Sequence, residues 1–571
     1  MIGVVARPEQ FEVVEEFFQL FKTPWQPYCS GRAYDVVIVT ADDVPEVQTR
    51  LLLVYGPETK RVDADLSIRP RTRRKGAMLK DQDAVLPIYG DLLTFVEGNK
   101  GVACHTAGSE SAGLTVDRAT FTVMRLGYDL FDEVAFLLSI GQPPENAHIP
   151  ALEIHIRMLR QWILEAGLSL LEIPPVPAGY DFSVCLTHDI DFAGIRNHKF
   201  DHTMWGFLYR ASIGSLAKYF RGRLSLLKLL KNWQAALSLP FVYAGWATDF
   251  WAPFDWYLTV EKDLPATYFL IPFKGQAGDN VPGPNASRRA AAYDITDVPS
   301  STATLLKEGC ELGVHGIDSW HSAEKGRHEL ARIATVTGRQ NIGVRMHWLL
   351  RNDNTFHVLE EAGYSYDASS GYNETVGYRN GTTQAFCPPG ARAILELPLH
   401  IQDGALFYPQ RLDLSEAEAE KRCQALIHNS SSFGGVLTLL WHDRSHAPER
   451  LWGEFYAGLL QSLSSRKCWF GTAAQVVSWF RHRRKVRFER VEEQGSARIR
   501  LHHEGDEIVP LLRIRVHMPA QRRAREERRA DESTGFVDSV WGGKSVAESE
   551  VQAATIPASA TLSDVALGSL P

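Results

Sequence analysis

The chain of 571 residues is too long for one ordinary hydrophobic core, so two or three domains are expected. Its composition, 44% hydrophobic and 23% charged residues, is typical of a soluble globular protein, and no run of about 18 apolar residues predicts a membrane span. A net charge of -7 argues against nucleic acid as the general partner.

The N-terminus and the cysteines favour a cytoplasmic location. The first residues, MIGVVARPEQ, contain an early arginine and a proline where a signal peptide needs an uninterrupted apolar core. The seven cysteines are scattered, and several lie in apolar runs, where free thiols behave as small hydrophobic side chains. We therefore expect a cytoplasmic protein; a position at the inner membrane surface is one alternative, which rests on the basic insertion described below.

Residues 1–178 show a mixed pattern that predicts an N-terminal α+β domain. Strands are expected at 35–39, 51–55 and 120–124, and helices at 129–140 and 150–166. The segment Ile173-Pro174-Pro175-Val176-Pro177 is typical of a linker and ends this domain. The pattern assigns no role to it.

Residues 181–480 alternate apolar strands with helical segments. Strands are expected at 182–187, 266–271, 311–314, 396–401 and 435–441. Such alternation predicts a parallel sheet or an α/β barrel, with chemistry at the C-terminal ends of the strands. Residues 486–518 predict a small β appendage, and residues 520–571 lack the apolar content to fold and predict a disordered tail.

An insertion at about 196–255 separates the first two of these strands. Apolar residues recur in it at roughly helical spacing, with basic residues among them: Leu216, Tyr219, Phe220, Leu224, Leu227, Leu230, Arg210, Lys218, Arg221, Arg223, Lys228 and Lys231. Two interpretations stay open, a helical hairpin packed on the barrel and a basic amphipathic surface that contacts an anionic membrane.

The first candidate site is the stretch Thr187-His188-Asp189-Ile190-Asp191, which ends a buried strand. Side chains alternate along a strand, so Asp189 and Asp191 point the same way. Two like charges on one face are costly unless a cation or a proton lies between them. A strand-end turn with solvated aspartates is the simpler alternative.

A second cluster follows the strand at 311–314. His315, Asp318 and His321 lie within seven residues, and histidine and carboxylate side chains at such spacing are typical of half a metal site. Asp191 would supply the other half. His442 ends the strand at 435–441 in the same way.

Two shorter segments carry further polar residues. Arg345 stands in Val344-Arg345-Met346-His347-Trp348, and Asp367 in Tyr366-Asp367-Ala368-Ser369-Ser370. His347 is interpreted as an ordinary core or surface histidine, since a lone histidine more often has a structural role. Each segment alone is a weak signal, and their common order along one α/β region makes them specific.

In this order the motifs resemble those of polysaccharide deacetylases of carbohydrate esterase family four, the chitin and peptidoglycan deacetylases. The resemblance covers residues 181–480 and implies a distorted (β/α) barrel with a divalent metal held by one aspartate and two histidines. The implied roles are Asp189 as general base, Asp191 and His315 as metal ligands, Arg345 as the residue holding the base, Asp367 as the carboxylate orienting the acid, and His442 as general acid.

One position departs from the family pattern. The family spaces its two histidines four residues apart, whereas the fourth residue after His315 is Ser319 and the next histidine is His321. His321 is therefore expected as the third ligand if the segment is a loop, with Asp318 as its rival.

The resemblance implies a hydrolase that removes N-acetyl groups from the amino sugars of a polysaccharide, an oligosaccharide or a lipid-linked precursor of a surface polysaccharide. Its cofactor would be a divalent metal, zinc first, with cobalt or nickel as alternatives. Deformylases of lipid-linked amino sugars resemble the second motif region too. A hydrolase of non-carbohydrate C–N bonds, similar to allantoinase, and an inactive scaffold of a polysaccharide assembly complex are the competing hypotheses. Oligomeric state does not follow from the sequence.

Overall fold

The computed structural model describes residues 1–81, 84–118, 120–493, 496–519, 535–543 and 547–549. The chain divides into two compact units. The first comprises Met1–Gly179, Asn380–Pro389 and Trp479–Pro571, and the second comprises Tyr180–Arg379 and Gly390–Ser478. The short segment Asn380–Pro389 therefore belongs to the first unit, although it interrupts the second in sequence.

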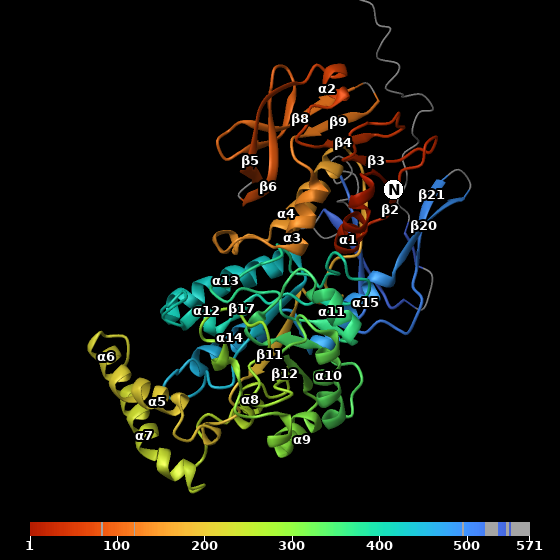
Figure 1. Ribbon diagram of the computed structural model, residues 1–571. Coiled ribbons are helices and arrows are strands. Elements are labelled where there is room, and N and C mark those ends of the chain that lie inside the picture. Colours follow the sequence, from red (N-terminus) through yellow and green to blue (C-terminus); the bar gives the residue numbers. More distant parts are fainter. Residues whose placement is uncertain (82–83, 119, 494–495, 520–534, 544–546, 550–571) are drawn as a thin grey trace, which may run out of the picture. The chain divides into compact units, whose positions relative to one another are not determined.

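The first unit contains a mixed nine-stranded sheet of order β2-β1-β3-β4-β9-β8-β6-β5-β7 (Figure 1). The strands are β1 (Ile2–Val5), β2 (Trp25–Pro27), β3 (Val36–Val39), β4 (Leu51–Tyr55), β5 (Arg69–Asp81), β6 (Ala84–Val96), β7 (Gly101–Thr106), β8 (Ser111–Asp117) and β9 (Thr122–Leu126). The expected strands near 35–39, 51–55 and 120–124 are confirmed as β3, β4 and β9. The expected helices are α3 (Leu130–Ser139) and α4 (Ala151–Glu165), and α1 (Phe11–Phe21) precedes them.

The segment after Trp479 belongs to the first unit and does not form a separate appendage. β20 (Arg487–Glu493), β21 (Ser496–His502) and β24 (Ala547–Ser549) form one three-stranded sheet, and β22 (Leu512–His517) pairs with β10 (Leu170–Glu172) and β23 (Phe536–Trp541) in another. Strands β23 and β24 lie within 520–571, so the expectation of a tail without structure is wrong there. Residues 520–534, 544–546 and 550–571 lie outside the described part of the chain.

The second unit is built on a parallel sheet that curls into an open half-barrel (Figure 1). Its order is β16-β15-β14-β13-β12-β11-β18-β17, and β19 (Cys468–Phe470) also pairs with β11. The strands are β11 (Phe182–Ile190), β12 (Ala266–Leu270), β13 (Glu311–Gly316), β14 (Val344–Met346), β15 (Tyr366–Asp367), β16 (Leu395–Glu396), β17 (Ile401–Gln402) and β18 (Val436–Leu440). No pairing among the described strands joins β16 to β17, so the sheet is not a closed barrel.

The central strands were the predictable ones. All nine residues of β11 are buried, as expected of a parallel strand covered on both faces, and its apolar run marks it in the sequence. The expected strand at 396–401 is instead two short strands, β16 and β17, with a turn between them. β14 and β15 have three and two residues, too short to leave a hydrophobic pattern.

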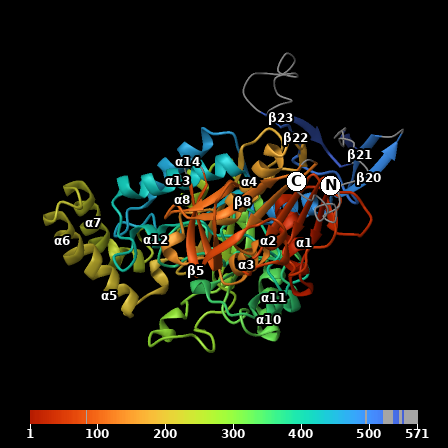
Figure 2. The ribbon, with the colours of Figure 1, turned by 90° about the horizontal axis from the view of Figure 1, so that it is seen from above.

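The insertion at 196–255 is helical, as expected. It consists of α5 (His202–Tyr209), a π-helical turn (Arg210–Gly214), α6 (Ser215–Phe220) and α7 (Leu226–Tyr243), and it projects from the strands of the second unit in both ribbon views (Figure 1, Figure 2). Its helices pack on each other through Met204, Phe207 and Leu239, among others. None of the described helices combines the length and hydropathy that crossing a bilayer requires.

Candidate metal centre

Three ligand-type side chains meet where neighbouring strands of the half-barrel end. Asp191 is the first residue beyond β11, His315 lies near the end of β13, and His347 directly follows β14. β13 and β14 are adjacent and in parallel register, with His315 opposite Arg345. The parallel arrangement therefore brings residues far apart in sequence to one edge of the sheet.

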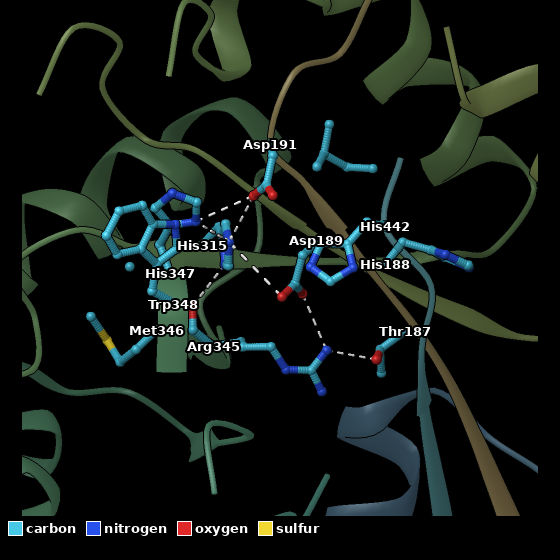
Figure 3. Close-up of polar contacts among 12 residues, drawn as sticks. Thr187, His188, Asp189, Asp191, His315, Arg345, Met346, His347, Trp348 and His442 are labelled. Carbon is cyan, nitrogen blue, oxygen red and sulfur yellow. Dashed lines mark hydrogen bonds and ion pairs between the residues drawn. The ribbon is translucent and has the colours of Figure 1, made fainter. Parts of the chain in front are cut away.

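The three side chains converge on one point (Figure 3). Nε2 of His315 and Nδ1 of His347 each lie 3.2 Å from Oδ1 of Asp191. The two imidazole nitrogens are 2.8 Å apart. Among the described residues, this is the group whose ligand atoms lie close enough together to hold a metal ion.

The chemistry of these donors fits a divalent cation. Nδ1 of His315 lies 3.0 Å from the Arg345 carbonyl oxygen, so a proton on Nδ1 leaves the Nε2 lone pair facing the other two donors. Burial lowers the pKa of His347 to about 4, which keeps its ring neutral. Oδ1 of Asp191 is buried without a hydrogen-bond donor among the described residues. A cation between these atoms would satisfy all three.

His321 does not join this group, which corrects the expectation from sequence. Its Nε2 lies 3.1 Å from Oδ1 of Asp318, and the other oxygen of Asp318 pairs with Lys325 at 2.7 Å. Asp318, the rival candidate, is therefore engaged in an ion pair. Ser319, at the position where the family has histidine, donates its hydroxyl to Glu329 at 2.6 Å. The third donor of the group is His347, which directly follows the next strand, β14.

Asp189 lies beside the triad without belonging to it. Its Oδ2 is 3.9 Å from Nε2 of His315, and its Oδ1 is 3.2 Å from Nη1 of Arg345 (Figure 3). The Arg345 guanidinium is fully buried and also donates to Thr187 at 2.6 Å and to the Ala368 carbonyl at 2.8 Å. These contacts fix the guanidinium, which in turn holds the buried Asp189 carboxylate in place beside the triad.

His442 is paired with Asp403, a residue that the sequence did not single out. Nδ1 of His442 lies 2.6 Å from Oδ1 of Asp403, and the His442 backbone N–H donates to Oδ2 at 2.9 Å. Burial alone would lower the pKa of His442, but Asp403, with Asp191 and Asp189 nearby, raises it to about 10. The pairing with Asp403 therefore favours the protonated imidazole at neutral pH.

Asp367, expected to orient the acid, has another role. Its Oδ1 accepts from Ser369 and from the Ala368 backbone N–H, and its side chain hydrogen-bonds to the buried Glu396. Burial and the neighbouring Asp367 raise the pKa of Glu396 well above its usual range, so the two carboxyl groups share a proton. Asp367 therefore supports the turn behind Arg345, and Asp403 takes the place beside His442.

Replacing Asp403 by asparagine is expected to lower the pKa of His442, because it removes the paired negative charge. His442 donates only when protonated, so activity is lost as the pH rises through its pKa, and this loss should come at lower pH in the variant. The pH dependence of kcat/KM measures the shift. Asp367→Asn is the matched control, and an equal shift there would contradict the assignment of Asp403.

The candidate metal centre opens into a cavity of about 580 Å³. Asp189, Asp191, His315, His347 and His442 all line it. Of the aromatic residues near the motifs, Trp348 lines the cavity with 38% of its surface exposed, and Trp441 is buried. Trp348 has φ +64°, a strained conformation for a bulky residue, and it lies directly after His347 of the triad.

Two functional residues were missed for different reasons. His347 follows a three-residue strand without a hydrophobic pattern, although its neighbour Arg345 was recognised. Asp403 begins the short helix α12 (Asp403–Phe407) after the two-residue strand β17, and only the pairing of β17 with β18 brings it to His442. The available signal for His347 was its place beside the motif arginine.

The sequence matches no protein-family model and no curated protein. Among solved structures, a putative polysaccharide deacetylase from Mycobacterium smegmatis has 16% identity and a TM-score of 0.31, over 54% of this chain and 95% of that chain. Puue allantoinase has 14% identity and a TM-score of 0.31, over 54% and 92%. Agd3, described as a novel carbohydrate deacetylase, has 9% identity and a TM-score of 0.38, over 96% and 98%. Polysaccharide deacetylases are thus among the solved structures to which this chain is similar.

Proposed function

We propose that the protein is a metal-dependent hydrolase that removes N-acetyl groups from the amino sugars of a polysaccharide, an oligosaccharide or a lipid-linked precursor. The observation that carries this proposal is the pairing of a three-donor metal group with a separate carboxylate, Asp189, and a protonated histidine, His442, in one cavity. Amide hydrolysis needs these parts: a base for the water and an acid for the departing amine.

The triad with Asp189 and the pair His442–Asp403 serve different steps of the reaction. A divalent ion held by Asp191, His315 and His347 would supply Lewis acidity for the water and the acyl carbonyl. Asp189, fixed by Arg345, accepts the proton of the attacking water as the new C–O bond forms. His442, kept protonated by Asp403, gives its proton to the nitrogen as the C–N bond breaks. The products are acetate and a free amino sugar.

Zinc is the proposed metal, with cobalt or nickel as alternatives. Two imidazoles and one carboxylate form a three-ligand set that leaves coordination positions for water and substrate, as catalytic zinc sites require. The aromatic ring of Trp348 at the cavity provides a surface on which a sugar ring can stack.

Acetate release tests this function directly. The purified full-length protein, supplied with zinc or cobalt, is incubated with N-acetylglucosamine and N-acetylgalactosamine oligosaccharides, and acetate is measured. Release that a chelator abolishes supports the proposal. If protein with stoichiometric bound metal releases no acetate, a non-carbohydrate amide becomes the favoured substrate. If the protein neither retains metal nor releases acetate, the inactive scaffold is favoured.

A further inference from the structure

Arginines gather on one part of the cavity wall that the hydrolytic reaction does not use. Arg210, Arg411 and Arg444 line the cavity together with Tyr408. We propose that this wall binds a phosphate group carried by the amino-sugar substrate, an inference that rests on the proposed function. Planar guanidinium groups match phosphate oxygens in geometry and charge, and arginine clusters are the usual means of binding phosphate.

The arginines converge on the ring of Tyr408. The guanidinium carbons of Arg411 and Arg450 lie 5.6 and 4.4 Å from the centre of this ring. Arg444 stacks on Phe192 at 4.0 Å, which holds its guanidinium at the cavity. The positive charge is therefore fixed by packing.

Carboxylates neutralise this cluster only in part. Among the described residues, Glu449 approaches Arg210 at 3.8 Å, and it also accepts a hydrogen bond from Trp251. The Nε atoms of Arg210 and Arg450 are buried without an acceptor among the described residues. Mutual repulsion adds to burial in lowering the pKa of Arg210 to about 10, and Arg450 and Arg444 lower the pKa of Tyr408 although burial opposes this. Asp403 and Asp443 also act on Arg411, Arg444 and Arg450, so four arginines face three buried carboxylates and positive charge predominates on this wall.

The same segment of chain connects this wall to the catalytic acid. Asp403, which holds His442, begins α12, and Tyr408 and Arg411 follow this helix within a few residues. Backbone hydrogen bonds from Tyr408 to Gly404 and from Arg411 to Tyr408 tie the segment together. A phosphate bound at the arginines would accordingly be held in fixed register with the group that protonates the leaving amine.

Titration of the full-length, metal-loaded protein with inorganic pyrophosphate in a calorimeter tests the phosphate site. Arg411→Gln and Arg210→Gln should each weaken binding about tenfold or more, because each removes charge-assisted hydrogen bonds. Arg327→Gln is the control, since Arg327 pairs with Glu361 on the exposed surface. If pyrophosphate bound only to the metal, the wild type, the two cavity variants and the control would all bind it with the same affinity.

Absent binding by the wild type, or equal binding by the variants and the control, would overturn the proposal. This measurement does not depend on turnover, so it stands even if acetate release fails. With activity in hand, N-acetylglucosamine 1-phosphate in solution and a polyprenyl-phosphate-linked N-acetylamino sugar in vesicles distinguish a soluble from a lipid-linked source. The variants should lose the preference for whichever phosphate substrate is used over free N-acetylglucosamine.

A separate observation concerns the outer face of the helical insertion. On α7, Leu226, Leu230, Trp233, Leu237 and Phe241 form one exposed stripe at helical spacing. Ala235, Leu239 and Val242 lie on the opposite, buried side. α7 is thus apolar on two faces, and only one of them packs on the rest of the second unit.

The insertion exposes further large apolar side chains. Phe220 and Leu227 are 78% and 74% exposed, and Trp205 and Tyr209 are exposed on α5. Residues 199–246 contain seven lysines and arginines and one acidic residue. Arg223, Lys228 and Lys231 pair with Asp413, Glu416 and Glu454, and Arg210 lines the cavity, so Lys199, Lys218 and Arg221 supply the remaining positive charge. The structure assigns this surface to contact with an anionic phospholipid bilayer.

Flotation of the full-length protein with vesicles tests the bilayer contact. The protein should float with vesicles containing phosphatidylglycerol at low salt, and Leu227→Asp should weaken this partitioning about tenfold or more, since a buried leucine contributes that much. Ile140→Asp, at an exposed apolar position of the first unit, is the matched control. Wild-type protein that stays unbound, or a wild-type dimer that Leu227→Asp dissociates without any vesicle binding, would refute the assignment.

Discussion

Asp189→Asn is expected to reduce kcat by about 10²- to 10⁴-fold, the usual contribution of a general base, while the protein keeps its metal. Asp189 lies outside the triad: its Oδ2 is 3.9 Å from Nε2 of His315. Removing its charge therefore leaves the three donor atoms of the triad in place. The measurement is acetate release together with metal content by atomic emission. Asparagine preserves the shape of the side chain and its contact with Arg345.

A variant with full activity would exclude Asp189 as the base, and a variant that loses its metal would make Asp189 a ligand. Arg345→Lys is a second variant that tests the same step, because Arg345 holds the Asp189 carboxylate. Arg345 is fully buried and donates to Asp189, Thr187 and a backbone carbonyl at once, which a lysine cannot reproduce. We expect lower kcat in this variant with metal content unchanged.

His347→Ala is expected to lower metal affinity by more than about 100-fold, because loss of an outer contact alone costs 10- to 100-fold. Its Nδ1 lies 3.2 Å from Asp191 and 2.8 Å from His315, so the alanine removes one of three donors. Activity should fall with the metal content and recover in part when excess zinc is added. Competition with a chromophoric chelator gives the affinity.

His321→Ala is the matched control, since it removes a histidine that the motif spacing had favoured. His321 contacts Asp318, outside the triad, so its loss should leave metal affinity and kcat nearly unchanged. The reverse result, with His321→Ala losing metal and His347→Ala keeping it, would show that the segment after β13 rearranges to bind the ion. Circular dichroism would verify that both variants are folded.

The local hydrophobic pattern was sufficient to predict the site residues that lie at the ends of buried strands of five or more residues. β11, β13 and β18 carry apolar runs that mark them, and Asp189, Asp191, His315 and His442 lie at their ends. Alternation along β11 placed the two aspartates on one side, and the structure has both at the cavity. The α/β class and the helical insertion followed from the same periodicities.

Tertiary structure alone decided two partners: His347, which the sequence analysis interpreted as an ordinary histidine, and Asp403, which it did not single out. His347 and Asp403 follow strands of three and two residues, which are strands only because β13 and β18 pair with them. Backbone hydrogen bonds to the neighbouring strand fix such a short segment, and the segment is too short to show an alternating hydrophobic pattern in the sequence. Sequence alone therefore determined which chemical groups are present, and the pairing of strands decided which of them meet.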